Sequence, residues 1–452
     1  MFKRFSKTIL CCFLSLLAAG ASFFVAAQTQ TTAPARSSTL SHYLDQTAGM
    51  TADDAVDIAL ENNTELAAMR KERDAAEAMV RQARLRANPS LEASGTKQIG
   101  APDNSYMVKG MLPLELGGRR NARIRVAERE LAVRETAVAD RERILASEVR
   151  TKFGDALAET LKLKFSEDVL AAVVRQYHLV QTRVTDGKIA PLEENMTLVE
   201  VNRLRSALET ASGRTEIAFL ELRNLLGMKP DEPMRLRGDF DNLVVPLPSI
   251  ADTTANALQA RPDLAGLRAM EELATAQIEQ AKAGGRLDAS VTSGYQRMNS
   301  SFPLNGLTDT GQVRPIQDIF HFFTFGVTFE VPVLNRNQGA VEAAFAMRDA
   351  ARNRREFGEL IVRREIAVAF ARYESSAKAT EIFRVGVRGQ ASANLDVVRQ
   401  TYELGSRNLI DYLIEQRRYI DIENEFIDLQ LAVFNANVEM LRAANSPELK
   451  KK

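Results

Sequence analysis

The residue types that most often carry out chemistry are sparse in this chain and do not group at spacings that build a site. None of the three histidines, His42, His178 and His321, has a second histidine or a cysteine at metal-ligand spacing. The glycine pairs at 117–118 and 284–285 flank strand-like segments and are typical of turns, and no phosphate-binding loop follows a strand. No nucleophile elbow is recognisable. The sequence therefore predicts a protein that is not an enzyme and uses no cofactor or metal site of its own.

Composition narrows the class of protein further. The chain has 452 residues, with 59 basic and 59 acidic side chains and 6% aromatic residues. A nucleic-acid-binding protein normally shows a basic excess, which is missing here. Beyond the N-terminus, no apolar stretch reaches the ~20 residues that a membrane-spanning helix needs. A β-barrel membrane protein is not excluded, because the strands of a barrel leave only a weak alternating pattern in the sequence.

The N-terminal segment, residues 1–27, has the features of a secretory signal peptide. Three basic residues open it, an apolar run starts at Ile9, and Val25–Ala27 ends in small residues. An uncleaved anchor helix is the alternative. Cys11 and Cys12, the only cysteines, precede most of the apolar run, so we expect no lipid anchor. The exported chain would then lack disulfides and must be held together by packing or assembly.

The chain repeats itself once, at a spacing near 200 residues. Thr51 and Ser249 each stand three residues before an acid, which is the pattern of a helix-capping box. Further matches pair Ala59–Leu60 with Ala257–Leu258 and Gln82–Arg84 with Gln280–Lys282. We therefore expect two structural repeats, residues 28–248 and 249–445, followed by a C-terminal tail at 446–452.

Each repeat is predicted to run in the order helix, β-hairpin, long helix, helix. In the first repeat, a helix of about 35 residues precedes a hairpin at 90–116, helices at 120–183 and 192–226, and a proline-rich linker at 227–248. In the second, the same elements are a helix, a hairpin at 286–333, and helices at 340–403 and 409–444. Each long helix would be on the order of 90 Å long. Leu131, Val138 and Leu145 recur every seven residues, which is typical of a coiled-coil seam.

The second hairpin carries one insertion. The spacing between matching residues rises from about 196 to about 219 between its two strand-like segments. Residues 297–319, where the insertion falls, are rich in Asn, Ser, Pro and Gly. We expect a loop that projects into solvent there.

The predicted strands have one large apolar face. In the segment Phe323–Val331, apolar and small polar residues alternate strictly. A half-buried sheet of a soluble protein would give the same alternation. However, each strand has about 9–11 residues, enough to cross a bilayer when tilted, and the neighbouring helices are too charged to cover a sheet. We therefore expect these side chains to face lipid, with Tyr295 at an interface: Phe323, Phe325, Val327, Phe329, Tyr106, Val108 and Leu112.

Four strands cannot enclose a lumen, and open strand edges are not tolerated in lipid. Other copies of the chain must therefore complete the wall. Two copies would give a barrel of eight strands, and side chains would fill its interior. Three copies would give twelve strands, which leave room for a pore. The small polar residues opposite the apolar face favour the wet lumen of a trimer.

At this point the sequence resembles the TolC family of outer-membrane efflux proteins over residues 50–445. The matching segments are Arg261–Leu264, Leu112–Arg119, Val331–Gly339 and Tyr402–Gly405. Within them, Asn335–Gly339 is most similar to the CzcC-like branch, the outer-membrane partners of heavy-metal efflux pumps. The resemblance implies a mainly α fold with a small transmembrane β part. Long coiled-coil-like helices would form a periplasmic tunnel, and four strands per chain a trimeric twelve-stranded barrel.

The ends of the strands agree with this resemblance. Pro113 and Pro332 stand where each hairpin gives way to a long helix, and Gly117 and Gly339 follow them. Proline ends the pairing of a strand, and glycine permits a sharp change of direction. We expect a strand-to-helix turn at both places.

The resemblance also implies a gate at the periplasmic helix tips. The residues that match the family's hydrogen-bonded and ion-paired gate are Glu193, Tyr402, Arg407 and Asp411. Ile414 stands where some members have a second lumen aspartate, so only one acidic ring is expected. Three Asp411 carboxylates in a narrow pore would attract cations. The alternative is that these residues are solvated charges at a helix tip. The tip turns at Gly187 and Gly405 would dock an adaptor.

Together with the strand pattern, the resemblance thus implies a homotrimeric outer-membrane exit duct of a Gram-negative bacterium. It also implies that the duct works passively with a periplasmic adaptor and an inner-membrane transporter of the RND type, with heavy-metal cations as one candidate cargo. Metal selection would then take place in those partners. One alternative is the outer-membrane channel of type I protein secretion, and another is a soluble periplasmic coiled-coil scaffold.

Overall fold

The computed structural model describes residues 40–246 and 248–450. The predicted signal peptide at 1–27 lies outside them. The elements of the first repeat are α1 (Leu40–Tyr43), α2 (Ala52–Asn62), α3 (Thr64–Arg84), β1 (Ser90–Lys97), β2 (Asn104–Pro113), α4 (Arg119–Thr185) and α5 (Pro191–Leu226). The linker that follows contains the short helix α6 (Phe240–Leu243).

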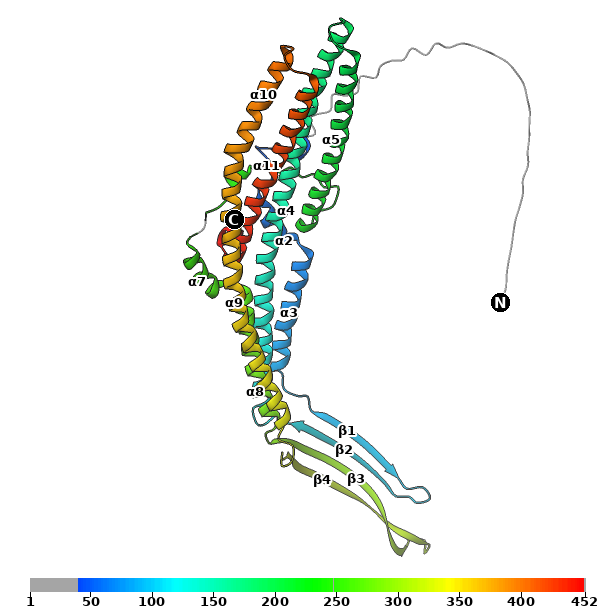
Figure 1. Cartoon of the computed structure of the whole chain (residues 1–452). Helices are drawn as coiled ribbons and strands as arrows, with labels where there is room; N and C mark the ends of the chain where they lie inside the picture. Colours follow the sequence, from blue (N-terminus) through cyan, green and yellow to red (C-terminus); the bar gives the residue numbers. More distant parts are fainter. Residues whose placement is uncertain (1–39, 247, 451–452) are drawn as a thin grey trace, which may run out of the picture. The chain divides into compact units, whose positions relative to one another are not determined.

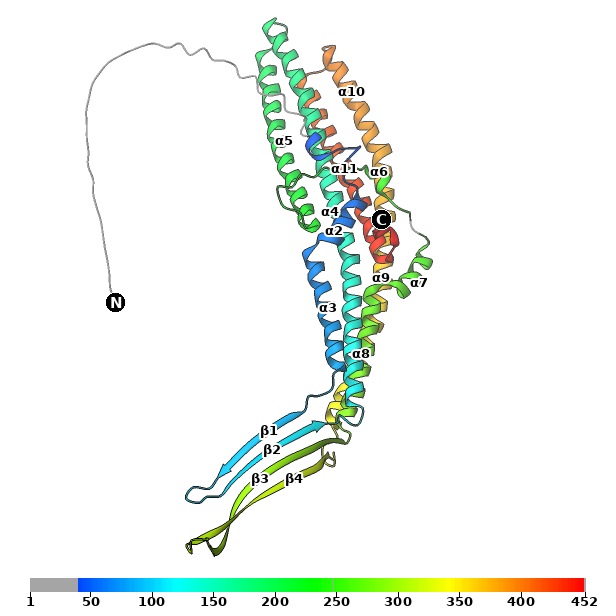
Figure 2. The same ribbon diagram turned by 180° about the vertical axis from the view of Figure 1, so that it is seen from behind.

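The second repeat has the same order of elements. They are α7 (Ile250–Ala260), α8 (Pro262–Gly284), β3 (Asp288–Leu307), β4 (Val313–Glu330), α9 (Gln338–Ile382), a π-helical segment (Phe383–Arg388), α10 (Gly389–Glu403) and α11 (Leu409–Ala444). A 3₁₀ helix at Pro447–Lys450 follows. The helices of both repeats run side by side, and the strands continue from one end of them (Figures 1 and 2).

The two repeats also agree in single hydrogen bonds. Thr51 and Ser249 are the N-caps of α2 and α7, and each side chain accepts from the backbone N–H three residues on. Arg70 and Arg268 each donate to the backbone carbonyl ten residues earlier, at 2.9 and 2.6 Å. The capping pattern predicted at the start of both repeats is therefore confirmed.

The first helix of each repeat is not continuous, so the prediction of one helix of about 35 residues was wrong. Asn63 separates α2 from α3, and Arg261 separates α7 from α8; both have extended backbone, with ψ of 118° and 127°. The Asn63 side chain accepts from Leu66 N at 3.0 Å and so begins a new helix. At the second break, Pro262 disfavours helical backbone at the residue before it.

Arg261 has a structural role at this break. Its guanidinium is buried and donates to Asp263 at 2.6 Å and to Glu365 of α9 at 2.9 Å. It also donates to the carbonyl of Ala443, near the end of α11, at 3.1 Å. One side chain therefore fixes the start of α8 against both helices.

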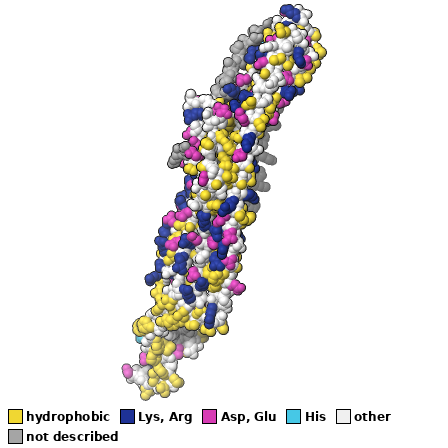
Figure 3. Space-filling view, turned by 60° about the vertical axis from the view of Figure 1, so that its left-hand side comes forward, with side chains coloured by type: hydrophobic (Ala, Val, Ile, Leu, Met, Phe, Trp, Pro, Cys, Tyr) yellow, Lys and Arg dark blue, Asp and Glu magenta, His cyan; other side chains and the backbone are white. Residues whose placement is uncertain are grey.

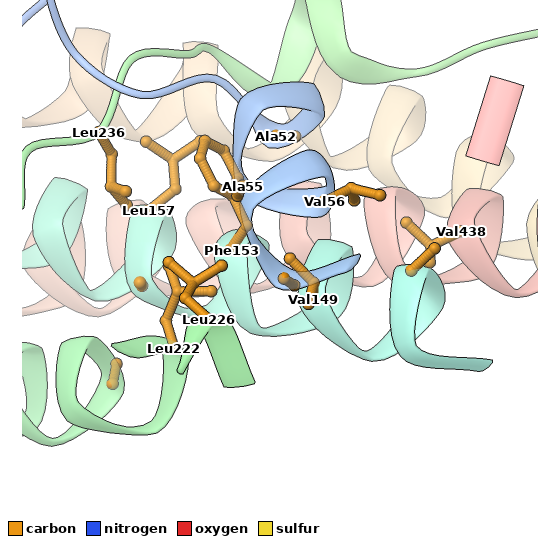
Figure 4. Close-up of a cluster of buried hydrophobic side chains, with 14 of the residues drawn as sticks. Ala52, Ala55, Val56, Val149, Phe153, Leu157, Leu222, Leu226, Leu236 and Val438 are labelled. Atoms are coloured by element: carbon orange, nitrogen blue, oxygen red, sulfur yellow. The ribbon is translucent and has the colours of Figure 1, made fainter. Parts of the chain in front are cut away.

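The largest hydrophobic core joins the short helix α2 to three long helices. Phe153 and Leu157 of α4 lie among Val56 of α2, Leu222 of α5 and other buried side chains (Figure 4). Close packing leaves no room for larger residues here, because a Cβ added at Gly154 would lie 2.6 Å from the Phe434 ring. The core thus holds α11 against α4 at mid-length.

The outer surfaces of the helices carry mixed charges (Figure 3). Ion pairs link neighbouring helices, such as Arg129 with Glu272 at 2.7 Å and Arg355 with Glu271 at 2.7 Å. In the part of the chain that the structure describes, no helix has both the length and the apolar character required to cross a membrane.

The four strands form one antiparallel sheet in the order β1-β2-β3-β4. The two hairpins, one from each repeat, are joined by the pairing of β2 with β3. The helices cover neither face of this sheet in the described residues (Figures 1 and 2). The sheet therefore cannot be stabilised by a core of its own chain.

The insertion at 297–319 is not a loop, and this prediction was wrong. The strands continue through it, so that β3 has 20 residues and β4 has 18, and only the turn at 308–312 separates them. The prolines that suggested a loop, Pro303 and Pro315, lie around an irregularity of the pairing between Ser301 and Asn305. A hairpin edge tolerates proline at such a place. The β3–β4 hairpin extends beyond the shorter β1–β2 hairpin, which pairs only up to Asn299.

The long helix predicted at 340–403 is interrupted by the π-helical segment. Its counterpart α4 runs without a break from Arg119 to Thr185. Gly386 lies inside the segment and Gly389 follows it directly, and glycine lowers the stability of regular helix. The Arg388 guanidinium lies over the Phe426 ring at 4.5 Å and donates to Glu423 at 2.9 Å, which ties the irregular turn to α11.

Candidate functional site

The register of the sheet brings the predicted lipid-facing side chains of both hairpins onto one face. Val108 of β2 stands opposite Tyr295 of β3, which stands opposite Phe323 of β4. Leu112, Val291 and Val327 form another row of this face, nearer to the helices. Tyr106 lies in the row on the other side of Val108, farther from the helices. We call this the apolar face.

Large side chains of the apolar face are strongly exposed. Phe323 and Phe325 are 71% and 78% exposed, although neither carries a polar group. Along the middle of β3, Val291, Ser293 and Tyr295 on this face are exposed while the residues between them are half-buried. Hydrophobic side chains dominate the sheet end of the molecule in Figure 3. An exposed apolar surface of this kind marks a contact with lipid or with another molecule.

The opposite face, here the polar face, is formed mostly by small or polar side chains. Glu92 stands opposite Lys109, and Gly294 stands opposite Thr324. This agrees with the division into two faces that the alternation predicts.

The outer end of the polar face departs from this pattern. Phe320 lies between Phe302 and Phe322, with ring centroids 6.0 and 6.3 Å apart. Sequence reasoning missed this aromatic cluster because it treated residues 297–319 as a loop. The alternation of β4 could have revealed it, since Phe322 and Phe320 continue the even-numbered side of the strand.

Both outer edges of the sheet are open within the described residues. β1 pairs only with β2, and β4 pairs only with β3. Unpaired backbone N–H and C=O groups line these edges, and in a bilayer each would cost several kcal/mol, of order 2–7. A chain that places this sheet in lipid needs further strands on both sides.

The strand-to-helix turns differ between the repeats. Pro113 is the last residue of β2, and Gly117 has a positive φ of 69°, with Arg286 so close that a Cβ would lie 2.7 Å from it. After β4 and Pro332, the positive φ belongs to Asn337, at 59°, whereas Gly339 lies inside the first turn of α9. Asparagine adopts this conformation more readily than most residues, and the Asn337 side chain donates to the carbonyl of Ala281 in α8 at 2.8 Å. The prediction of a direction-changing glycine at Gly339 was therefore wrong.

The helix tips are alike in the two repeats. Gly187 follows α4 with a φ of 71°, and Gly405 follows α10 with a φ of 75°. In both turns the N–H of the next residue donates back to the helix: Lys188 to Arg183 O and Ser406 to Thr401 O, each at 2.9 Å. This is the hydrogen bonding of a Schellman C-cap, which requires the left-handed residue.

The structure brings the predicted gate residues together in two pairs near these tips. The Tyr402 hydroxyl donates to Glu193 Oε2 at 3.4 Å and so links α10 to α5. Burial raises the pKa of this phenol, and the negative charge of Glu193 raises it further. Arg407 and Asp411 lie 3.9 Å apart at the start of α11. Because both of these side chains are well exposed, their pair is worth about 0–1 kcal/mol within one chain.

A third group of charges at the tips was not anticipated. Glu200 of α5 is 5% exposed, accepts two hydrogen bonds from Arg203, at 2.9 and 2.6 Å, and one from Arg417 of α11, at 3.4 Å. Burial alone would raise the pKa of this carboxyl, but the hydrogen bonds and charges of the two arginines lower it below its usual value. The i, i+3 spacing of Glu200 and Arg203 was visible in the sequence, whereas nothing there indicated Arg417.

The described residues contain no group of three histidine, cysteine or acidic side chains that could hold a metal ion. Of the histidines, His321 lies on the apolar face, where its Nδ1 is 2.6 Å from the Tyr295 hydroxyl. His178 lies on α4, and its backbone carbonyl accepts from Thr182.

Comparisons with known proteins agree with this geometry. Residues 55–228 and 254–446 match the outer membrane efflux protein family. The chain is 25% identical to the cobalt-zinc-cadmium resistance protein CzcC of Cupriavidus metallidurans, over 81% of this chain and 83% of that one. It is also 25% identical to outer membrane protein OprJ of Pseudomonas aeruginosa, over 86% and 82%.

Solved structures share the fold. CusC superimposes with a TM-score of 0.72 at 19% identity, over 90% of this chain and 95% of that one. The open state of the MtrE outer membrane channel of Neisseria gonorrhoeae gives a TM-score of 0.69 at 19% identity, over 87% and 88%. The fold is therefore the TolC-like one, with long helices and four strands per chain. Since the family match covers both repeats, this chain belongs to the outer membrane efflux protein family and is an efflux channel protein of the outer membrane.

Proposed function

We propose that three copies of this chain form the passive exit duct of a tripartite efflux pump. The observation that carries the proposal is the uncovered four-stranded sheet with two open edges. Three such sheets give a closed barrel of twelve strands, which has no edges and is wide enough for a wet lumen. The apolar face would then meet lipid and the polar face would line the pore.

The helices extend from the sheet with charged surfaces, as suits an aqueous compartment. On this proposal they form the periplasmic tunnel, and the turns at Gly187 and Gly405 meet a periplasmic adaptor. The duct has no energy source, so an inner-membrane transporter of the RND type must supply it. Membership in the efflux family supports both partners.

We take heavy-metal cations as the cargo. The similarity to a protein named for resistance to cobalt, zinc and cadmium supports this choice. A duct of this kind need not hold the ion, because an ion passes most readily where binding is weak. The tip charges Asp411 and Glu193 would favour cations over anions.

The test uses the full-length protein, solubilised from outer membranes with detergent. Added to a planar bilayer, it is expected to insert pores with stable, cation-selective conductance. In a host that depends on this duct, its deletion is expected to raise cellular cobalt, zinc and cadmium. A water-soluble monomer without conductance would contradict the proposal. Unchanged metal content together with lost protein secretion would favour a type I secretion channel.

The gate is proposed at the helix tips, where Tyr402 and Glu193 connect the two repeats and Arg407 faces Asp411. The double variant Arg407→Ala/Asp411→Ala is expected to increase the leak conductance of single pores severalfold, because contacts between tips of neighbouring copies are lost. The control is Arg384→Ala/Glu381→Ala, an exposed pair at 2.9 Å where α9 meets the π-helical segment, away from the tip. Equal leak in both double variants would mean that the Arg407 pair is a solvated surface feature.

A further inference from the structure

Two cations enter the apolar face in neighbouring rows at the outer end of the β1–β2 hairpin, where Ile319 of β4 is also exposed. Tyr106, Arg297 and His321 stand opposite one another on β2, β3 and β4. Lys97 of β1 lies on the same face, in the next row outward, opposite Asn104. We call Lys97, Tyr106, Arg297 and His321 the basic rim.

The positive charges of the basic rim have no partner. Among the described residues, no ion pair or hydrogen bond engages the side chain of Arg297 or Lys97, whereas Arg119 at the other end of the sheet lies 3.0 Å from Asp288. The nearby acids are placed elsewhere. Asp318, opposite Ser300, and Glu92, opposite Lys109, belong to the polar face.

The acid nearest to the rim, Asp103, pairs with neither cation. Its carboxylate accepts hydrogen bonds from the backbone N–H, at 2.9 Å, and the hydroxyl of Ser301. This contact ties the turn of the first hairpin to β3. Within the described residues, the rim therefore has two cationic side chains without an ion-pair partner.

The rows below the rim define what it can bind. Val108, Tyr295 and Phe323 come next, and the following rows contain Phe325, Leu112 and Val327. Moving outward, a molecule on this face would meet aliphatic and aromatic side chains first, then the Tyr106 and Tyr295 hydroxyls, then cations. This is the sequence of environments of a membrane lipid whose acyl chains end in an anionic head group.

The position of the basic rim along the strands determines which leaflet of the outer membrane it meets. It lies at the outer end of the β1–β2 hairpin, partway along the longer β3 and β4, whereas the end of the sheet next to the helices carries the paired Arg119. With the helices in the periplasm, the rim faces the outer leaflet. We propose that the basic rim binds the phosphates of an outer-leaflet lipid, one lipid per protomer. This rests on the proposed function, because it requires the apolar face to meet a bilayer.

The experiment measures binding of lipid A with both phosphates to the detergent-solubilised oligomer by native mass spectrometry. The double variant Lys97→Gln/Arg297→Gln is expected to bind about thirtyfold more weakly, since each of the two cations contributes about 1 kcal/mol near a lipid surface. The matched control is Lys109→Gln, which removes a cation from the polar face of the same sheet. Lys97→Arg/Arg297→Lys keeps both charges and should bind as the wild type does.

Three results with the lipid would overturn the inference, and a fourth comes from competition with phosphate. They are equal binding by the double variant and the wild type, an equal loss in the Lys109→Gln control, and equal binding of lipid A from which the phosphates were removed. Inorganic phosphate that competes as well as the lipid would also overturn it, because the site would then be a phosphate site. Pore conductance separates this inference from the proposed function. Conductance should persist in the double variant, whereas its absence in the wild type would contradict the duct itself.

Discussion

At the scale of single residues, the helix tips show which contacts join the two repeats. Arg407, in the turn before α11, pairs with Asp411 in the first turn of that helix, so this pair does not itself join α11 to a helix of the first repeat. Glu200 does join the two repeats, because its buried carboxylate accepts hydrogen bonds from an arginine of α5 and an arginine of α11. A buried carboxylate between two guanidinium groups is stable only while it is ionised.

This arrangement predicts how Glu200→Gln behaves. The variant should lower the stability of the protein at neutral pH by about 1–2 kcal/mol, the low end for a charged hydrogen bond, because both arginines are well exposed. The pKa of Glu200 is lowered from 4.5 in the folded protein. Its stabilising contribution is therefore complete well above pH 4.5 and is lost as the pH falls through the lowered pKa.

Thermal unfolding in detergent, followed by circular dichroism between pH 7 and pH 3, measures this difference. The control is Glu209→Gln, an exposed carboxyl on the same helix without an ion-pair partner among the described residues. A difference between wild type and Glu200→Gln that stays constant down to pH 3 would show that the charge of Glu200 does not stabilise the tips.

At the scale of elements, the helices were predictable because heptad and capping patterns are local. The breaks at Asn63 and Arg261 were missed although their causes are local, the Asn63 cap of α3 and the proline that follows Arg261. The π-helical segment was missed because it depends on a distant element, since Glu423 and Phe426 of α11 hold it.

In the second hairpin, the prediction of a loop at 297–319 was wrong because local composition was given too much weight. Prolines and asparagines at 297–319 are frequent in loops, and their composition outweighed the alternation of Ile319, His321 and Phe323. Pairing with β3 decided the outcome, and the prolines were accommodated where that pairing is irregular. The alternation could have placed Phe320 and Phe322 on the polar face, whereas the contact of Phe320 with Phe302 depends on cross-strand pairing, which the sequence does not give.

The division of the sheet into two faces can be tested with neighbouring residues of β4. Phe325→Arg places a charge on the apolar face and should destabilise the folded protein in vesicles by about 2–4 kcal/mol if it lies near the middle of the bilayer. Thr324→Arg is the matched control, because the adjacent side chain points to the polar face and should cost much less. Urea titration of vesicle-bound protein measures both, and equal costs would contradict the assignment of the faces.

At the scale of the whole molecule, the number of copies decides whether the sheet encloses a pore. The edge strands β1 and β4 must meet those of neighbouring copies, and closure requires that the last copy returns to the first. Three sheets enclose a lumen, whereas two sheets give an eight-stranded barrel with an interior that is filled by side chains. A ring also limits its own size, since no edge is left to which a further copy could bind.

The number of copies in the ring can be measured by cross-linking the edge strands of neighbouring copies. The native cysteines, Cys11 and Cys12, lie in the predicted signal peptide, so the exported chain would contain only introduced thiols. A cysteine at Ser94 of β1 is combined in turn with one at each polar-face position of β4 from Phe320 to Thr328. In the outer membrane, oxidation of the pair in register should give covalent dimers and trimers on denaturing gels and nothing larger.

The control is Val108→Cys/Tyr295→Cys, which joins directly opposite residues of β2 and β3 and should give only cross-linked monomers. Each possible outcome has a distinct physical meaning. A ladder that stops at the dimer would indicate an eight-stranded closure without a wide lumen, and an open-ended ladder would indicate edges that never close. A ladder that stops at three fixes the barrel at twelve strands, because only a closed ring uses up every edge.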